Sequence, residues 1–220
     1  MTGKKNMVIS FSGIDGSGKT TQINLLTDYC EKHGIKFLKR WSKARGPPGI
    51  MFIKQLVRRD KKMNQEEKLA HREEVYNSSW KKKVLYALSM IDLCFYWGIY
   101  LRFLKHTCNL LILDRYLWDT YVEVSNEFHI KDLHHHLLWK LVKFCALKPE
   151  VSLLLIIPAE ESLRRDLLKG EITTDALELK RAKTDMYMML KEKGAWNTCI
   201  DSMTTVENTH NEILKALNYN

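Results

Sequence analysis

The chain has 220 residues, a formal net charge of +9 at pH 7, 45% hydrophobic residues and 28% charged residues. This length allows one substantial hydrophobic core, and the composition excludes a disordered or fibrous protein. The longest apolar stretches are short or carry charges such as Asp92 and Arg102, so they predict buried segments rather than membrane spans. No cleaved signal peptide is expected, and the five scattered cysteines are typical of reduced thiols in the cytoplasm.

The first predicted elements are a buried strand at residues 7–11, the motif G-x-x-x-x-G-K-[ST] at 13–20, and a helix ending near Gly34. The glycines leave backbone N–H groups free to surround a phosphate, and the helix N-terminus adds a partial positive charge. Lys19 can reach the β- and γ-phosphates, and the Thr20 hydroxyl can ligate Mg²⁺. We therefore expect a nucleoside triphosphate to bind at Gly13, Asp15, Gly16, Ser17, Gly18, Lys19, Thr20 and Thr21.

Strand and helix patterns alternate along the rest of the chain. The predicted order is a strand at 35–41, a turn-rich stretch at 42–49, helical residues at about 50–106, a strand at 110–113, helix to about 146, a strand at 151–157, helix at about 160–193 with an interruption near 170, a strand at 198–201 and a helix at 206–217. About five short apolar strands separated by helices predict an α/β fold, with a parallel sheet covered by helices on both faces. This is the three-layer sandwich of P-loop proteins.

A second group of candidate residues follows the strand that ends at Leu113. Asp114 stands where a Walker B carboxylate would hold Mg²⁺, usually through water, and the alternative is a cap for the next helix. Arg115 would enter the same cleft, where a guanidinium can grip a phosphate bidentately. Ligands of such sheets bind at the carboxyl ends of the strands, so Asp15 and Arg45 are expected in that cleft as well.

The segment 11–22 and the Asp-Arg-Tyr triplet at 114–116 together resemble the thymidylate kinase family of nucleoside monophosphate kinases, in matching order over about residues 5–217. The resemblance implies one kinase domain, residues 1–220, with a lid at about 159–175. It also implies ATP as phosphate donor, Mg²⁺ as cofactor, and a (deoxy)nucleoside monophosphate as acceptor.

The same resemblance implies roles for single residues. Asp15 would accept a hydrogen bond from a sugar hydroxyl of the acceptor, and Arg164 or Arg165 would neutralise the transition state once the lid excludes water. The implied catalytic residues are Lys19, Asp15, Arg115, Arg164 and Arg165. The implied substrate-binding residues are Asp15, Arg45, Arg58, Asp114, Arg115 and Tyr116, with Asp201 in the loop that holds adenine and Thr20 and Asp114 at the metal.

The acceptor loops depart from the family pattern. Residues 43–49 are altered, and Met90 stands where the family has an arginine that meets the thymine ring. Because base specificity comes from polar groups that the wrong ligand leaves unpaired, we expect weak selectivity among monophosphates or another acceptor altogether. The alignment also predicts that Met90→Arg improves thymidylate use.

Two other functions remain open. The altered loops favour, as the alternative, a kinase of a nucleoside, a sugar or a biosynthetic intermediate, for which Asp15, Asp92 or Glu123 could be the base. A regulatory nucleotide-binding switch is less favoured, because the string nearest to the guanine-reading sequence Asn-Lys-x-Asp, at residues 182–185, lacks the Asn and follows no strand. The expected partners are a nucleoside triphosphate and a small phosphorylated acceptor, without membrane or specific nucleic-acid binding, and a homodimer stays open.

Overall fold

The structure, a computed structural model, describes residues 6–41, 79–128, 130, 132–168 and 177–219. They fall into two compact units. The sheet unit contains the described residues of Met1–Lys43, Phe103–Glu123 and Lys148–Asn220, and the helical unit contains those of Ala44–Arg102 and Val124–Leu147.

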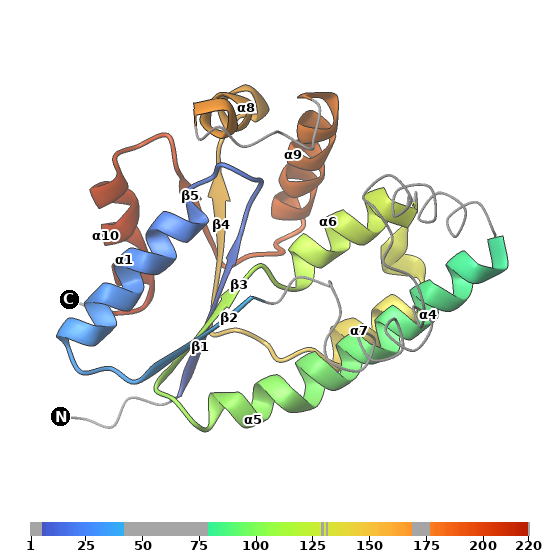
Figure 1. The fold of residues 1–220 in the computed structure, drawn as a ribbon, viewed down its shortest axis with the longest axis horizontal. Helices are drawn as coiled ribbons and strands as arrows, with labels where there is room; N and C mark the ends of the chain where they lie inside the picture. The colour runs from blue at the N-terminus through green and yellow to red at the C-terminus, as the bar shows by residue number, and fades with distance from the viewer. Residues whose placement is uncertain (1–5, 42–78, 129, 131, 169–176, 220) are drawn as a thin grey trace, which may run out of the picture. The chain divides into compact units, whose positions relative to one another are not determined.

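The sheet unit is built on a five-stranded parallel sheet with the order β2-β3-β1-β4-β5 (Figure 1). The strands are β1 (Met7–Ser12), β2 (Phe37–Trp41), β3 (Leu110–Asp114), β4 (Val151–Ile156) and β5 (Thr198–Asp201). Strand β1, which leads into the glycine-rich loop, lies at the centre and pairs with β3 and β4. Because all the pairings are parallel, the carboxyl ends of the strands share one edge. The predicted strands are thereby confirmed.

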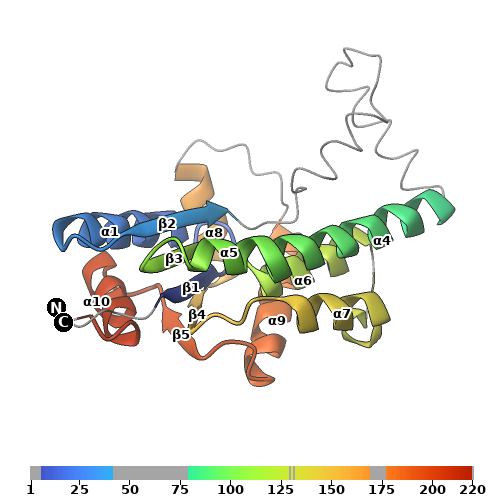
Figure 2. The same ribbon diagram turned by 90° about the horizontal axis from the view of Figure 1, so that it is seen from below.

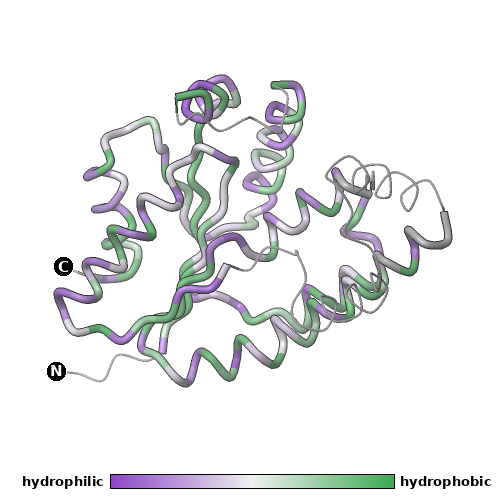
Figure 3. Tube along the Cα trace, viewed as in Figure 1, coloured by the Kyte–Doolittle hydropathy of each residue, from purple (hydrophilic) through white to green (hydrophobic). Residues whose placement is uncertain are grey.

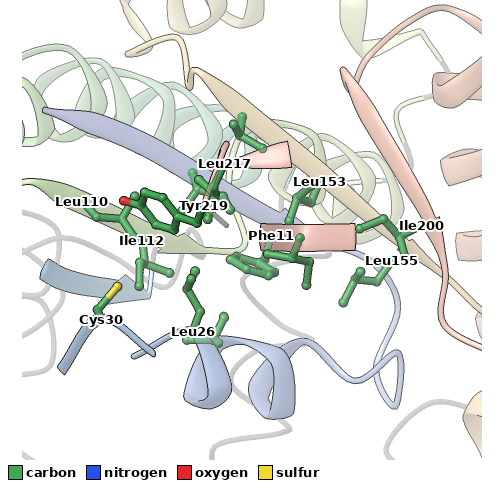
Figure 4. Packing of buried hydrophobic residues seen from close by; sticks show 14 residues of the cluster. Phe11, Leu26, Cys30, Leu110, Ile112, Leu153, Leu155, Ile200, Leu217 and Tyr219 are labelled. Atoms are coloured by element: carbon green, nitrogen blue, oxygen red, sulfur yellow. The ribbon is translucent and has the colours of Figure 1, made fainter. Parts of the chain in front are cut away.

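Helices α1 (Lys19–Lys32) and α10 (Val206–Ala216) pack on one face of this sheet. Alternate strand residues supply the core, as a period of two requires, and the strands run through the most hydrophobic part of the unit (Figure 3). The close-up in Figure 4 shows the cluster formed by Phe11, Leu26, Cys30, Leu110, Ile112, Leu153, Leu155, Ile200, Leu217 and Tyr219. Burial of this apolar surface is the main force that holds the sheet to its helices.

On the opposite face, α9 (Leu177–Glu192) lies against residues of β4. Leu154 and Ile156 line a shallow hollow together with Tyr187 and Met188 of that helix. Helices α6 (Leu117–Phe128) and α8 (Ala159–Leu168) follow β3 and β4 directly. The α/β sandwich with helices around the sheet is thus as predicted, and the helical stretch expected at 160–193 is divided into α8 and α9, with residues 169–176 outside the described part of the chain.

The helical unit contains α4 (Ser79–Phe95), the π-helix η1 (Tyr96–Tyr100), the start of α5 (Leu101–Lys105), the end of α6, the short 3₁₀-helix η2 (Leu133–His135) and α7 (Leu137–Cys145) (Figure 2). Gly98 lets the π-helix approach the end of α7, because a Cβ at this position would lie 3.2 Å from the Cys145 carbonyl oxygen. Arg102 donates hydrogen bonds to the carbonyls of Gly98 and Cys145, so it closes the C-terminus of α7. The turn expected at 42–49 and the first part of the helix expected at 50–106 lie outside the described residues.

The long helix running from α4 into α5 is not the buried core helix that the sequence predicts. Its segment Tyr86–Lys105 is long and apolar enough to cross a membrane by length and composition, a test that core helices of soluble proteins also pass, and 33% of its apolar window is buried. A row of large apolar side chains on α4 and η1 is exposed: Val84, Leu88, Ile91, Phe95 and Ile99. The period of three or four residues places them on one side of the helix.

Candidate active site

The loop after β1 has the backbone geometry of a phosphate cradle. Gly13, Gly16 and Gly18 have φ angles of 143°, 75° and 87°, which side-chain-bearing residues rarely adopt. Gly18 is the N-cap of α1. The unpaired N–H groups of the first turn of α1 therefore point toward the loop. A Cβ on Gly16 would lie 3.1 Å from the carbonyl oxygen of Ser162, so a side chain there would require α8 to shift slightly.

Lys19 is buried inside this loop. Its ammonium donates to the carbonyls of Gly13 (2.8 Å) and Ile14 (2.7 Å) and to the Ser17 hydroxyl (3.2 Å). Burial, with the positive charge of Arg115 next in importance, lowers the pKa of Lys19 to about 7. The ammonium is held by weak dipoles rather than by a full negative charge, so an incoming phosphate can take over these contacts.

Arg115 and Asp15 form an ion pair at the carboxyl edge of the sheet. Arg115 follows β3, where its N–H donates to the Phe11 carbonyl (2.9 Å) and its φ is 63°. A non-glycine residue in the left-handed region is strained, and such strain concentrates at functional sites. Although burial alone would lower the pKa of Arg115, Asp15 and Asp119 hold it above its ordinary value.

Asp119 is a fully buried carboxylate that sequence reasoning did not single out. It receives hydrogen bonds from Ser12, Gly13, Tyr116 and Tyr187. The available signal is its place three residues after the N-cap of α6, where an acidic side chain caps the helix start. That signal does not reveal the donors from β1 and α9, which come from remote parts of the chain.

Asp114 and Thr20 are the two residues that the sequence predicts at a magnesium ion. Asp114 is the last residue of β3 and is half-buried. Burial raises its pKa, and the positive charges of Lys19 and Arg115 oppose that rise. No described residue donates a hydrogen bond to its carboxylate. Thr20 lies exposed in the first turn of α1. Within the described ranges no cluster of three or more His, Cys, Asp or Glu side chains could hold a metal ion.

The two lid arginines on α8 have different surroundings. Arg164 pairs with Glu161 (2.7 Å) and is 63% exposed. Arg165 pairs with the same carboxylate but also donates to the carbonyls of Gly16 (3.2 Å) and Ser202 (3.1 Å). Arg165 therefore lies against the P-loop, whereas Arg164 extends into solvent.

Helices α8 and α9 are joined by a buried polar chain that leads to the P-loop. Lys180 donates to Asp166 (2.6 Å) and to the Ser162 hydroxyl (3.0 Å), and Ser162 in turn donates to the Asp15 carbonyl (2.6 Å). Lys180 is 3% exposed. This buried lysine was also missed, because a lysine in a helix is usually solvated.

The remaining predicted residues are distributed as follows. Asp201 ends β5 and accepts the N–H of Met203 (2.9 Å), which shapes the loop after that strand. Tyr116 is 3% exposed, so its side chain is buried. Thr21 lies exposed on α1. Arg45 and Arg58 lie outside the described residues, and Met90 belongs to the helical unit, where it is 1% exposed.

The sheet order, the glycine-rich loop and its buried lysine define the class: a P-loop kinase fold. The family model "Thymidylate kinase" matches residues 11–213. The chain therefore belongs to the thymidylate kinase family, whose general reaction is the ATP-dependent phosphorylation of a nucleoside monophosphate.

Curated relatives agree along the whole chain at low identity. The probable thymidylate kinase of Pyrococcus horikoshii is 26% identical over 222 residues, covering 96% of this chain and 95% of the relative. That of Methanocaldococcus jannaschii is 27% identical over 218 residues, with 96% of each chain covered. The thymidylate kinase of Fervidobacterium nodosum is 26% identical over 220 residues, covering 96% of this chain and 98% of the relative.

Proposed function

We propose that this chain transfers the γ-phosphoryl group of ATP to a deoxynucleoside monophosphate, acting as one kinase domain over residues 1–220 with a lid at about 159–175. Family membership over residues 11–213 supports the reaction class. The observation that carries the proposal is the buried Lys19 ammonium, which lies in the loop next to the Arg115–Asp15 pair.

On the donor side, Lys19 and the loop N–H groups bind the ATP phosphates. Thr20 and Asp114 hold Mg²⁺, which when bound shields the phosphate charge. The negative charge of the phosphates stabilises the protonated form of Lys19, so nucleotide binding raises its pKa above the value of about 7 in the nucleotide-free protein. Asp201 shapes the loop that receives adenine.

On the acceptor side, Arg115 orients the acceptor phosphate and Asp15 accepts a hydrogen bond from its sugar. Arg45, Arg58 and Tyr116 complete this subsite in the proposal. A phosphate acceptor is already an ionised nucleophile, so no general base is needed. Arg165 neutralises the charge that develops on the transferred group, since it is the lid arginine that already contacts the P-loop.

The base of the acceptor is read with weak selectivity in this proposal, because Met90 replaces an arginine donor. The substitution Met90→Arg is a poor test of that idea. Met90 is 1% exposed, so an arginine there would bury an unpaired charge and we expect it to unfold the helical unit rather than improve thymidylate use.

A coupled assay of ADP release tests the proposal, with deoxynucleoside monophosphates and the corresponding nucleosides as acceptors. The expected result is turnover with several monophosphates and none with nucleosides. Arg115→Ala should raise the KM for the monophosphate and lower kcat while ATP affinity stays within about threefold, because the guanidinium serves the acceptor. Turnover with a nucleoside or a sugar instead would favour the alternative kinase of another small molecule.

The setting of the enzyme is also part of the proposal. The scattered cysteines support a cytoplasmic location. Association of two copies is supported by the exposed apolar row on α4 and η1, because such rows are seldom left in water. Sedimentation of the purified protein would show a dimer, and a monomer at micromolar concentration would contradict it.

A further inference from the structure

The carboxylate of Asp119 is completely enclosed and completely hydrogen-bonded. Oδ2 accepts from the Ser12 hydroxyl (2.5 Å) and the Tyr116 N–H (3.1 Å). Oδ1 accepts from the Gly13 N–H (3.2 Å) and the Tyr187 hydroxyl (2.7 Å). Its exposed fraction is 0%, so every one of these bonds is made away from water, where an unmade partner is costly.

These donors come from separate parts of the sheet unit. Ser12 ends β1, Gly13 begins the P-loop, Tyr116 is the residue before α6, and Tyr187 lies on α9. Capping of α6 accounts for the Tyr116 contact alone. The other contacts connect the start of α6 to the beginning of the phosphate loop and to Tyr187 of α9, which lies 68 positions further along the chain than Asp119.

The two peptide groups that flank the Cα of Gly13, the first residue of the P-loop, are consequently held by different side chains. Asp119 holds the Gly13 N–H, while the Gly13 carbonyl accepts from Lys19 (2.8 Å) and from Arg115 Nη1 (3.5 Å). Arg115 Nη1 also lies 3.9 Å from Asp119 Oδ1. Gly13 thus links Asp119, through its N–H, to the Lys19 ammonium and the Arg115 guanidinium, which both contact its carbonyl oxygen.

We propose that Asp119 is a positioning residue of the phosphate site. It fixes the Ser12–Gly13 peptide at the start of the P-loop and steadies Arg115 through Gly13, without touching a substrate itself. Its effect on nucleotide affinity rests on the proposed function, whereas its effect on the order of the loop does not.

Position and charge predict opposite results for Asp119→Asn. Asp119 is negative, so if only its charge mattered, removing it would strengthen the binding of an anionic nucleotide. If Asp119 positions the loop, the loop of the variant is less ordered and must be ordered when ATP binds. The affinity of the variant for ATP then falls about tenfold, which corresponds to about 1.4 kcal/mol of binding free energy. Tyr187→Phe removes one donor without changing charge and is expected to weaken ATP binding about threefold.

Glu150 provides the matched control. Its Oε2 accepts the N–H of Val8 (2.7 Å), so it is another carboxylate that bonds a backbone amide of β1, at the end away from the loop. Glu150→Gln should lower the unfolding temperature without changing ATP affinity by more than about twofold.

The experiment measures three quantities for the full chain and the three variants: the unfolding temperature, the Kd for ATP by calorimetry, and hydrogen exchange of the peptide spanning residues 12–18. The proposal predicts weaker ATP binding and faster exchange of that peptide in Asp119→Asn and Tyr187→Phe but not in Glu150→Gln. Unchanged or tighter ATP binding, or unchanged exchange, in the two loop variants would overturn it. If Asp119→Asn does not fold, Tyr187→Phe decides. Failure of the wild-type chain to bind ATP, with faster exchange in the loop variants, would overturn the proposed function and leave the positioning role standing.

Discussion

At the scale of single residues, the site is a small set of charges arranged around the Lys19 ammonium. The positive charge of Arg115 destabilises the protonated form of Lys19, and the carboxylates of Asp119, Asp15 and Asp114 stabilise it. Burial outweighs the carboxylates, so Lys19 titrates near neutral pH in the nucleotide-free protein. Because the protonated form of Lys19 is only weakly stabilised without ligand, a bound phosphate stabilises it strongly.

The lowered pKa of Lys19 makes the stability of the nucleotide-free protein depend on pH. Between about 7, the folded value, and 10.5, the unfolded value, the unfolded chain binds more protons, so the free energy of unfolding rises with pH. From pH 7 to 9 we expect wild type to gain about 2 kcal/mol relative to Lys19→Met. Urea unfolding without nucleotide or added metal ion measures this difference. Parallel curves for the two proteins would mean that Lys19 is fully protonated in the folded state.

The thiols add a second pH dependence to the stability of each protein, which is why wild type is compared with Lys19→Met. Burial raises the pKa of Cys30 from 9.0 to about 11, and burial with the neighbouring Cys145 does the same for Cys94. Above pH 9 the unfolded chain releases these protons first, so stability falls with pH there. The comparison with Lys19→Met cancels this contribution because both proteins carry the same cysteines.

The neighbouring arginines of α8 give a paired test at the same scale. Arg165→Ala removes a guanidinium that contacts Gly16 and Ser202, and we expect kcat to fall about a hundredfold, since such cations stabilise the transferring phosphoryl group. Arg164→Ala removes an exposed guanidinium with the same Glu161 partner and should leave kcat within about threefold. Steady-state kinetics with saturating ATP measures kcat of both variants. A larger loss for Arg164→Ala would reverse the assignment.

At the scale of secondary-structure elements, α9 and α8 are joined by a buried ion pair. Lys180 and Asp166 are 3% and 6% exposed and 2.6 Å apart. Asp166→Ala would leave the lysine buried without its counter-charge, which costs about 3–5 kcal/mol, and Asp166→Leu combined with Lys180→Met should recover most of that loss. Urea unfolding measures both variants.

A second ion pair between the same helices is the control for this prediction. Arg181 and Glu160 are 57% and 58% exposed, so Glu160→Ala should change the free energy of unfolding little. Equal losses for Glu160→Ala and Asp166→Ala would show that burial of the pair is unimportant.

Much of the sheet unit could be predicted from the sequence because its signals are local. Each strand is a short apolar run closed by a turn or a charge, as Leu110 to Leu113 before Asp114 illustrates. The glycine pattern before Lys19 specified the loop in the same way. Asp119 and Lys180 could not be predicted, because their partners lie on elements that only the folded chain brings together. The exposure of Phe95 and Ile99 was also missed, since an apolar run does not state which of its sides is covered.

At the scale of the whole molecule, the agreement with the thymidylate kinase family extends from residue 11 to residue 213, while identity to its curated members stays near 26%. The reaction class therefore follows from the family, and the acceptor is the property that remains to be measured.

The most direct measurement is transfer of a radioactive γ-phosphate from ATP, with separation and identification of the labelled product. The account predicts a labelled nucleoside diphosphate from several deoxynucleoside monophosphates, at rates that differ by less than about tenfold among bases. Lys19→Ala should fold normally and lose about a thousandfold in rate, since this lysine contacts loop carbonyls rather than the hydrophobic core. Label found on a nucleoside or a sugar and on no monophosphate, or full transfer by Lys19→Ala, would contradict it.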